Sequence, residues 1–389
     1  MKPNSRDKKR AIALAGGGPA AGLHIGALKA LEDAGIKFDV FALSCIGAWV
    51  GIVYNTRPGE KKSRAEETLD FFDKHCFRDD RSYEWFPINR GFATDVNALL
   101  NAWVSFPLSE RRVWQDLVLP LDMYKSYLNS VALFASPTRW TQQELNYWFL
   151  NDVLAVNPIA RYLTSLVYQS EINGLSKIFY KDSPVLKDVF KDDMLDHIDT
   201  DIYHNAWRLP VGVNEPGRMQ IFHNRPEKRP QKKDPYIKIT PESLCACSAL
   251  PYIEESVTIG GHEYTEGALV DTVNFKNLVR DHPDLDEVWV NRIVDDSQVR
   301  SARSLADALA NLPMQFAAEV GENDIKLFRQ HLLNQTRMKP RVVEIPFVSD
   351  TKVTFEWKRS NLMQGYAEGQ LAVKTLLSSD KELTRHKVA

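Results

Sequence analysis

Residues 11–51 read AIALAGGGPAAGLHIGALKALEDAGIKFDVFALSCIGAWVG, and the order of elements in this stretch predicts the fold class. An apolar run over 11–15 precedes three glycines, and the apolar residues after them recur at helical spacing up to about Gly35. A second apolar run, 38–43, leads into a tight turn and then into a helix of small and apolar residues over 47–54. Strand, loop, helix, strand, turn and helix in this order are typical of the opening of a parallel α/β sheet.

The first turn, Gly16 to Gly22 (GGGPAAG), lies between a strand and a helix. Backbone N–H groups at a helix N-terminus favour negative charge, so the turn suits either an oxyanion hole or a dinucleotide pyrophosphate site. Gly16, Gly18 and Ala21 fit the dinucleotide pattern G-x-G-x-x-G/A, but no acidic residue ends the second strand to hold a ribose. A P-loop is excluded because no Gly-Lys-Ser/Thr follows, and a purely structural turn remains open.

The second turn, Leu43 to Gly47 (LSCIG), has the features of a nucleophile elbow. An elbow needs a sharp strand-to-helix turn in which small residues flank the reactive side chain, and Gly47 follows Cys45 at the required place. Cys45 also begins the next helix, whose dipole favours a thiolate. The turn therefore predicts Cys45 as a candidate nucleophile.

Four blocks of the sequence resemble the patatin-like phospholipases. Leu14 to Gly35 is similar to the family's glycine-rich oxyanion segment and first helix, and Phe38 to Gly51 is similar to its strand and G-x-S-x-G elbow. Leu244 to Pro251 (LCACSALP) resembles the small-residue helix before the final catalytic strand, and Tyr264 to Val273 (YTEGALVDTV) resembles the segment with the Asp-Gly-Gly/Ala motif. The resemblance implies a three-layer α/β/α sandwich with a mostly parallel sheet. It also implies an oxyanion hole built from three glycines, Gly16, Gly17 and Gly18.

Departures from the family pattern fall on functional positions. Cys45 stands where the family has its nucleophilic serine, Leu43 where the elbow has its first glycine, and Glu266 where the dyad has its aspartate. Gly267 and Ala268 follow the acid as the motif requires. Either a Cys–Glu dyad persists, because a thiol ionises more easily than a hydroxyl, or the chemistry is lost and Cys45 is an inert thiol. The retention of both a nucleophile and an acid favours the dyad.

Other polar side chains near these blocks receive lesser roles. Ser44 is an alternative nucleophile, although Ile46 two places later does not suit an elbow. We expect His24 to pack on or cap the first helix, Asp271 to be a structural hydrogen-bond partner, and His262 to lie near the site if its strand is straight. No histidine–carboxylate cluster has metal-ligand spacing, so neither a metal nor a cofactor is expected.

The rest of the chain is expected to extend the same domain. A charged tail over 1–10 precedes a catalytic domain over 11–300, and a helical cap or insertion is expected at about 85–200. Five of the nine tryptophans lie between Trp85 and Trp148, and we expect these aromatic helices to form mainly buried core. A helical and strand extension packed on the domain is expected over 301–389. Further strands are predicted at 209–213, 219–222, 236–239, 288–293 and 341–345, and helices over 301–334 and 361–377.

The composition and charge of the chain limit the classes of partner that it could bind. The chain has 389 residues, 44% hydrophobic and 26% charged, with a net charge of -2, and this balance argues against nucleic acid. The densest basic stretch, Arg225 to Lys233, is expected to be a solvated loop, and contact with anionic lipid is the alternative. Four cysteines do not make a disulfide framework, and Cys245 and Cys247 are expected to be buried thiols. Without a secretory signal or membrane span, the sequence predicts a cytoplasmic protein whose membrane contact, if any, is peripheral.

The predicted function is a lipid acyl hydrolase of the esterase or phospholipase type. In this hypothesis Glu266 takes the Cys45 proton, the thiolate attacks an ester carbonyl, and an acyl-thioester enzyme follows. Three alternatives stay open: an acyltransferase that uses the same thioester, an inactive acyl-binding protein that keeps the pocket, and a dinucleotide-binding oxidoreductase. For the hydrolase, the acyltransferase and the acyl-binding protein, the expected partner is a lipid or another acyl ester.

Overall fold

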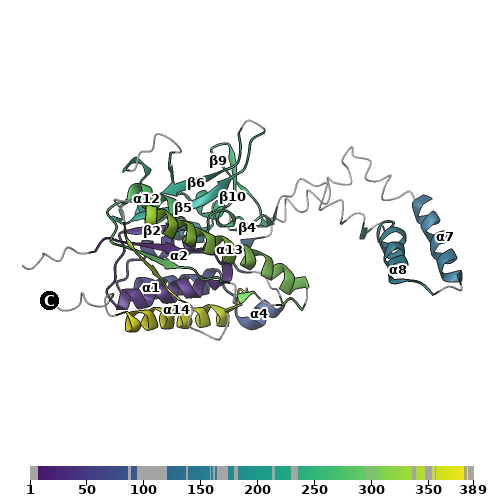
Figure 1. Cartoon of the computed structure of the whole chain (residues 1–389), viewed down its shortest axis with the longest axis horizontal. Coiled ribbons are helices and arrows are strands. Elements are labelled where there is room, and N and C mark those ends of the chain that lie inside the picture. The colour runs from purple at the N-terminus through teal and green to yellow at the C-terminus, as the bar shows by residue number, and fades with distance from the viewer. Residues whose placement is uncertain are drawn as a thin grey trace, which may run out of the picture. The chain divides into compact units, whose positions relative to one another are not determined.

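The structure is a computed structural model that describes residues 8–85, 89–93, 121–136, 139–157, 159–160, 163, 174–178, 183–212, 215–228, 235–295, 298–299, 301–303, 305–334, 339–346, 353–354, 356–380 and 383. The chain divides into two compact units, one made of 1–93 with 176–389 and the other of 94–175 (Figure 1). Residues 94–120 of the predicted cap lie outside the described residues, so the cap's boundaries stay a prediction.

The larger unit is organised around a mixed sheet of nine described strands. Five strands run parallel in the order β12–β11–β1–β2–β5, and β10 and β9 continue the order with antiparallel pairing. These strands are β1 (Arg10–Leu14), β2 (Val40–Leu43), β5 (Asp201–Arg208), β9 (Val257–Ile259), β10 (His262–Glu266), β11 (Glu287–Asn291) and β12 (Arg341–Glu344). The remaining two, β6 (Arg218–His223) and β7 (Ile237–Lys238), join on the free edge of β5. The expected α/β fold with a mostly parallel sheet is confirmed.

The pairing of β5 brings two distant segments together. Its first half pairs with β2, where Leu43 lies opposite His204, and its second half pairs with β10, where Glu266 lies opposite Ala206. Because β6 pairs with both halves, β2 and β10 must share the other edge of β5. The ends of β2 and β10 therefore meet end to end, with partners two residues apart on β5, a rise of roughly 7 Å.

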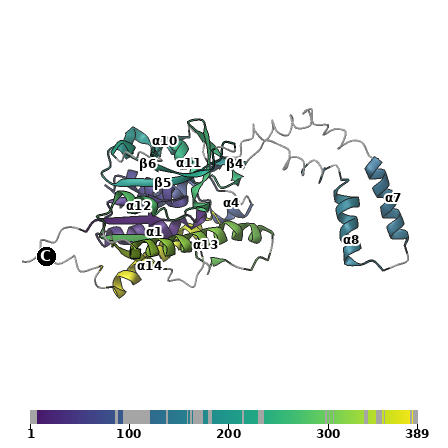
Figure 2. The same cartoon turned by 45° about the horizontal axis from the view of Figure 1, so that its top comes forward.

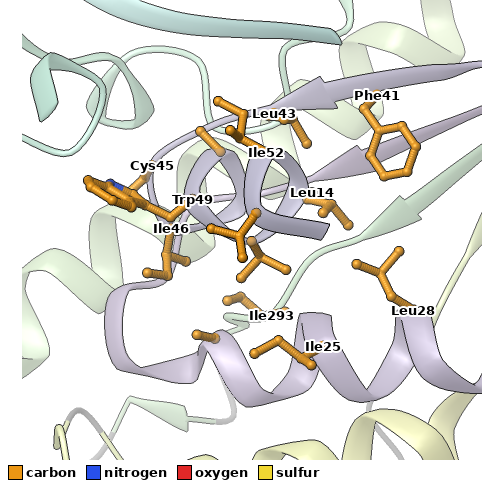
Figure 3. Packing of buried hydrophobic residues seen from close by; sticks show 14 of the residues in the cluster. Leu14, Ile25, Leu28, Phe41, Leu43, Cys45, Ile46, Trp49, Ile52 and Ile293 are labelled. Carbon is orange, nitrogen blue, oxygen red and sulfur yellow. The ribbon is translucent and has the colours of Figure 1, made fainter. Parts of the chain in front are cut away.

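Helices cover both faces of this sheet, as Figures 1 and 2 show. Ile12, Leu14, Phe41 and Leu43 point into a core formed with α1 (Ala21–Asp33), α2 (Ile46–Thr56) and α3 (Arg64–His75), part of which Figure 3 shows. The alternate residues of β1 and β2 point into a second core with α12 (Lys276–Asp281) and the C-terminal part of α13 (Leu305–Asn334). This alternation is the two-residue period of a strand buried on both faces. α14 (Arg359–Ser379) packs along α1.

Several short strands and helices complete the larger unit. A second sheet, β3 (Phe92–Ala93), β4 (Gly174–Ile178) and β8 (Tyr252–Glu254), stands apart from the main one. The other described helices of this unit are α4 (Asp80–Trp85), α10 (Pro184–Val189) and α11 (Pro241–Ala246). None of the helices in the described ranges is both long and apolar enough to cross a bilayer.

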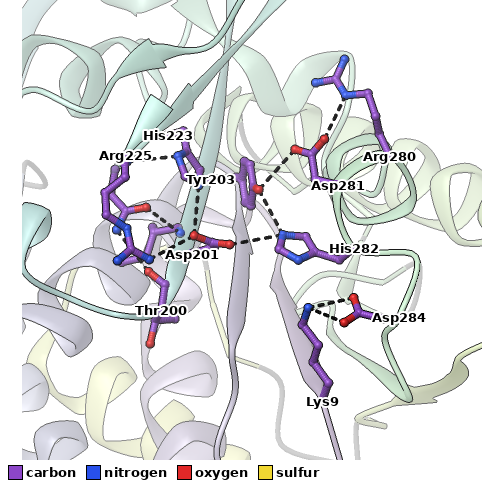
Figure 4. Close-up of polar contacts among 12 residues, drawn as sticks. Lys9, Thr200, Asp201, Tyr203, His223, Arg225, Arg280, Asp281, His282 and Asp284 are labelled. Atoms are coloured by element: carbon purple, nitrogen blue, oxygen red, sulfur yellow. Dashed lines mark hydrogen bonds and ion pairs between the residues drawn. The ribbon is translucent and has the colours of Figure 1, made fainter. Parts of the chain in front are cut away.

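The strand predicted at 209–213 was placed too late in the sequence. The strand is β5, Asp201–Arg208, which ends directly before that range. The sequence of β5, DIYHNAWR, is too polar to read as a buried strand, yet seven of its eight residues are buried. Its polar side chains are accommodated by a network in which Arg225 contacts Asp201 at 3.1 Å and the Tyr203 hydroxyl lies 3.0 Å from His282 Nε2 (Figure 4). Arg225 is thus buried, which corrects the expectation of a solvated loop at that residue; 229–234 lie outside the described residues.

The smaller unit contains a helical hairpin of α7 (Leu121–Ala135) and α8 (Gln142–Trp148), which continues into a π-helix, η2 (Phe149–Leu154). Trp148 links the helices, because its indole N–H donates to Ser130 Oγ at 2.8 Å and its ring lies edge-on to Phe134. Large side chains on these helices, including Tyr124, Tyr127 and Tyr147, are exposed. The expectation that such aromatic residues form mainly core is therefore wrong for this hairpin.

Candidate active site

The turn after β2 has the backbone of a nucleophile elbow. Cys45 has φ 49° and ψ −124°, a region that non-glycine residues rarely adopt, and α2 begins at the next residue (Figure 3). Gly47 lies so close to β1 that a Cβ there would be 2.2 Å from the Leu14 carbonyl oxygen. Leu43, which replaces the usual first glycine, is fully buried, and its side chain fills the space beside Gly51.

Glu266 reaches Cys45 through the sheet. It is the last residue of β10, at the point where β10 meets the end of β2 along β5, and its backbone N–H donates to Ala249 O at 2.9 Å. The Cys45 thiol and the Glu266 carboxyl group both face the same cavity, and each shifts the pKa of the other. Both side chains are almost fully buried, at 8% and 6% exposure. The two residues predicted as a dyad therefore lie at one site.

Burial dominates the ionisation of this pair. Loss of solvation raises the pKa of Glu266 to about 7, although the hydrogen bond from Cys45 opposes the rise. Burial, and secondly the charge of Glu266, raise the pKa of the Cys45 thiol well above its usual value. The N–H of Ile46 at the start of α2 favours the thiolate, but it does not outweigh these effects. The helix N-terminus thus favours the thiolate as expected, but burial outweighs it, so the pKa of Cys45 lies above its usual value beside a carboxyl group whose pKa is about 7.

The glycine turn lies directly against the dyad. A Cβ on Gly16 would be 3.3 Å from Cys45 Cβ and 2.9 Å from Ala268 Cβ, so the three residues are in close contact. Gly18 has φ 51° and opens a short 3₁₀ turn over Gly18–Ala20, with Gly17 before it. Within the described ranges, the N–H groups of Gly17 and Gly18 have no backbone acceptor. Such N–H groups beside a nucleophile can stabilise a developing oxyanion.

An apolar cavity of about 120 Å³ opens onto these groups. Gly16, Gly17, Gly18, Cys45 and Glu266 contribute to its wall. Most of the remaining wall is apolar, with the side chains of Trp49, Phe72, Leu250, Met314 and Trp357. A cavity of this kind suits an acyl chain whose carbonyl carbon lies at the thiol.

Buried polar groups that the sequence did not point to hold the two turns together. Asn205 on β5 accepts a hydrogen bond from Ser44 Oγ at 2.8 Å and donates one to the Asp271 carbonyl at 2.7 Å. Asp324 on α13 accepts from the backbone N–H of Thr272 at 2.8 Å. Asn205 thus ties the elbow to the loop after Glu266. Nothing in the sequence analysis pointed to Asn205, because the strand that carries it, β5, was not predicted.

Of the other predicted residues, Ala268 contributes to the cavity wall, whereas Ser44, His24, Asp271 and His262 do not. Ser44 is fully buried, and its hydroxyl donates to Asn205. His24 packs in α1 as expected, where its Nε2 lies 2.9 Å from Ala15 O and burial lowers its pKa to about 4. Asp271 is a structural hydrogen-bond partner, as expected, because its Oδ1 accepts from the backbone N–H of Asn274 at 2.7 Å. His262 opens β10 and contacts Arg208 at 2.7 Å, so it is away from the cavity wall.

Comparison with known proteins places these features in context. The model of the patatin-like phospholipase family matches residues 12–279. Among solved structures, the chain is similar to VipD from Legionella pneumophila, at 10% identity and a TM-score of 0.38, over 96% of this chain and 67% of that chain. It is also similar to the ExoU–SpcU complex of the type III secretion system of Pseudomonas aeruginosa, at 12% identity and a TM-score of 0.33, over 96% of this chain and 52% of that one. The chain thus spans about half the length of the latter. Comparison with curated proteins finds no match.

Proposed function

The chain belongs to the patatin-like phospholipase family, and from this premise we propose that it is a lipid acyl hydrolase that acts through Cys45 and Glu266. The observation that carries the proposal is a thiol held at a turn with positive φ that shares one cavity wall with a buried carboxyl group. Both groups open onto an apolar cavity beside the glycine turn. Nucleophile, base, oxyanion donors and acyl site thus occur together.

The first half of the proposed reaction acylates the enzyme. Glu266, as carboxylate, takes the thiol proton while the Cys45 sulfur attacks the ester carbonyl carbon. The carbonyl oxygen then carries the negative charge, which the N–H groups of Gly17 and Gly18 stabilise. When the tetrahedral intermediate collapses, the ester C–O bond breaks and the alcohol leaves with the proton held by Glu266. A base whose pKa is about 7 suits this exchange near neutral pH.

The second half of the reaction frees the thiol. Glu266 takes a proton from water, the water oxygen attacks the thioester carbonyl, and the acid leaves as the Cys45 thiol is reprotonated. Transfer of the acyl group to an amine or thiol instead of water is the variant that a thioester intermediate favours. Adding such acceptors to the assay and measuring acyl products would separate hydrolase from acyltransferase.

The test is hydrolysis of p-nitrophenyl esters of graded chain length by the wild type, Cys45→Ala and Glu266→Ala. We expect both variants to lose turnover. We also expect mass spectrometry after rapid quenching to find the acyl group on the wild-type peptide that contains Cys45. Cys245→Ala is the matched control, because this buried thiol lies outside the cavity wall. Absence of wild-type turnover on every ester, or full activity of Cys45→Ala, would contradict the mechanism.

One observation favours a second candidate, an acyl-binding protein without turnover. Burial and the Glu266 charge raise the pKa of the Cys45 thiol, and a thiol that is rarely ionised is a poor nucleophile. In this case the cavity binds acyl chains while no acyl-enzyme forms. Binding of a fluorescent fatty acid by the wild type together with no ester turnover would support this second function.

A further inference from the structure

Asn205 lies on β5 at the junction of the two strands that carry the dyad. The strand β2 ends opposite His204 and β10 ends opposite Ala206, so Asn205 is the residue between the two pairing points. Its side chain is fully buried, and it does not contribute to the described part of the cavity wall. Asn205 is therefore placed to act on the dyad through the surrounding backbone and not on a ligand in the cavity.

The side-chain amide of Asn205 uses its acceptor and its donor at once. Its Oδ1 accepts from Ser44 Oγ at 2.8 Å, and its Nδ2 donates to the Asp271 carbonyl oxygen at 2.7 Å. Ser44 Oγ lies 3.2 Å from the same carbonyl oxygen, which closes a ring of three groups. A carboxamide offers a donor and an acceptor in one plane, whereas leucine and an ionised aspartate of similar size cannot make both bonds.

The amide also contacts the chain neighbours of both dyad residues. Ser44 directly precedes Cys45, and Gly267 directly follows Glu266. A Cβ on Gly267 would lie 2.8 Å from Asn205 Oδ1, so the backbone packs closely against this oxygen atom. The same oxygen accepts from Ser44. One amide thus holds the chain next to each member of the dyad.

The turn at Cys45 needs such support because its backbone is strained. Cys45 has φ 49°, and a residue in this region stays there only where its surroundings hold it. Proton transfer and attack also depend on geometry, and a misplacement of about 1 Å can cost about a hundredfold in rate. A tie that lies one residue away from each partner is suited to fix their separation.

We propose that Asn205 is a positioning residue for the reaction, whose side-chain amide sets the separation between the Cys45 sulfur and the Glu266 carboxyl group. The inference rests on the proposed function in so far as this separation matters for turnover. Asn205 acts through Ser44 and Gly267, so it needs no contact with the substrate.

The reactivity of the Cys45 thiol tests the proposal without any turnover. The full chain is treated at pH 8 with iodoacetamide, a small neutral reagent, and mass spectrometry of the peptide that contains Cys45 gives the alkylation rate. Because ionised Glu266 raises the pKa of this thiol, Glu266→Gln should speed alkylation in the protein that keeps Asn205. In the Asn205→Ala background we expect this acceleration to be largely lost. Cys247, whose charge also raises this pKa, is present in every protein compared. The same factor in both backgrounds would overturn the proposal.

Two further variants separate positioning from stability. Asn224→Ala is the matched control, because Asn224 is also buried and its amide also bonds to the backbone, but near the start of β5. It should lose stability and keep the full acceleration by Glu266→Gln. Ser44→Ala removes one of the two bonds of Asn205, so it should reduce the acceleration, and it replaces Asn205→Ala if that variant does not fold. Full acceleration in Ser44→Ala, or its loss in Asn224→Ala, would overturn the role of Asn205.

Ester turnover provides a second readout. Asn205→Ala should lower kcat about tenfold or more and change KM little, since Asn205 is not part of the described cavity wall. An unchanged kcat would overturn the proposal. Absence of turnover in the wild type would contradict only the Cys–Glu reaction, because the alkylation rates do not depend on it.

Discussion

Replacing Glu266 with glutamine is expected to stabilise the folded protein at alkaline pH while it removes the proposed base. Burial raises the pKa of this carboxyl group from 4.5 to about 7 in the folded protein, so the folded state binds its proton more tightly than the unfolded state does. Between pH 4.5 and about pH 7, the Glu266 carboxyl group holds its proton in the folded state but has released it in the unfolded state. Stability therefore falls as pH rises through this window, and the cost of ionising Glu266 is complete above about pH 7.

The size of the effect follows from the two pKa values. The difference between 4.5 and about 7, at 1.36 kcal/mol for each pH unit, amounts to about 3 kcal/mol. Because Glu266 is only 6% exposed, solvent screening reduces this figure little. Glutamine cannot ionise and keeps an acceptor for the Cys45 thiol. The free energy of unfolding of Glu266→Gln, minus that of the wild type, should thus be larger by about 3 kcal/mol at pH 8 than at pH 4.5.

Urea unfolding of both proteins at pH 4.5 and pH 8, followed by circular dichroism, measures this difference. Asp324, whose pKa is also raised to about 7, is present in both proteins, so its contribution cancels. Glu263→Gln is the matched control, because Glu263 lies on the same strand but is exposed. The reasoning is refuted if Glu266→Gln changes stability equally at both pH values, or if it is less stable relative to wild type at pH 8 than at pH 4.5.

Three further substitutions test the elbow and its support. Gly47→Ala should destabilise the protein by about 1–3 kcal/mol and lower ester turnover, since the new Cβ would meet the Leu14 carbonyl; urea unfolding and the p-nitrophenyl assay check this. Cys45→Gly should be about 1–3 kcal/mol more stable than Cys45→Ala, because glycine adopts the positive φ without strain. Equal stabilities of the two variants would show that the backbone at residue 45 is not strained. Asn205→Ala should cost about 2–3 kcal/mol, because Ser44 and the loop after Glu266 lose a shared partner; thermal unfolding that matches wild type would count against this role.

Prediction from sequence succeeded where local pattern and local structure coincide. Apolar runs bounded by glycine turns located β1 and β2, and the second turn, predicted as an elbow, has a sharp backbone with positive φ at Cys45. Prediction failed at β5, because its buried side chains are polar and are stabilised by partners such as Arg225 that are distant in sequence. It also failed for the hairpin of α7 and α8, whose aromatic side chains the composition alone assigned to a core.

What the sequence by itself determined is the series of strands, turns and helices around Cys45, because these depend on spacing, on glycine and on neighbours in the chain. Only the tertiary structure decided that Glu266 and Cys45 share one cavity wall, since β2 and β10 meet only when both pair with the same edge of β5. It alone also decided the burial that raises the pKa of both groups. Burial and proximity between distant segments arise from folding, and a linear pattern does not contain them.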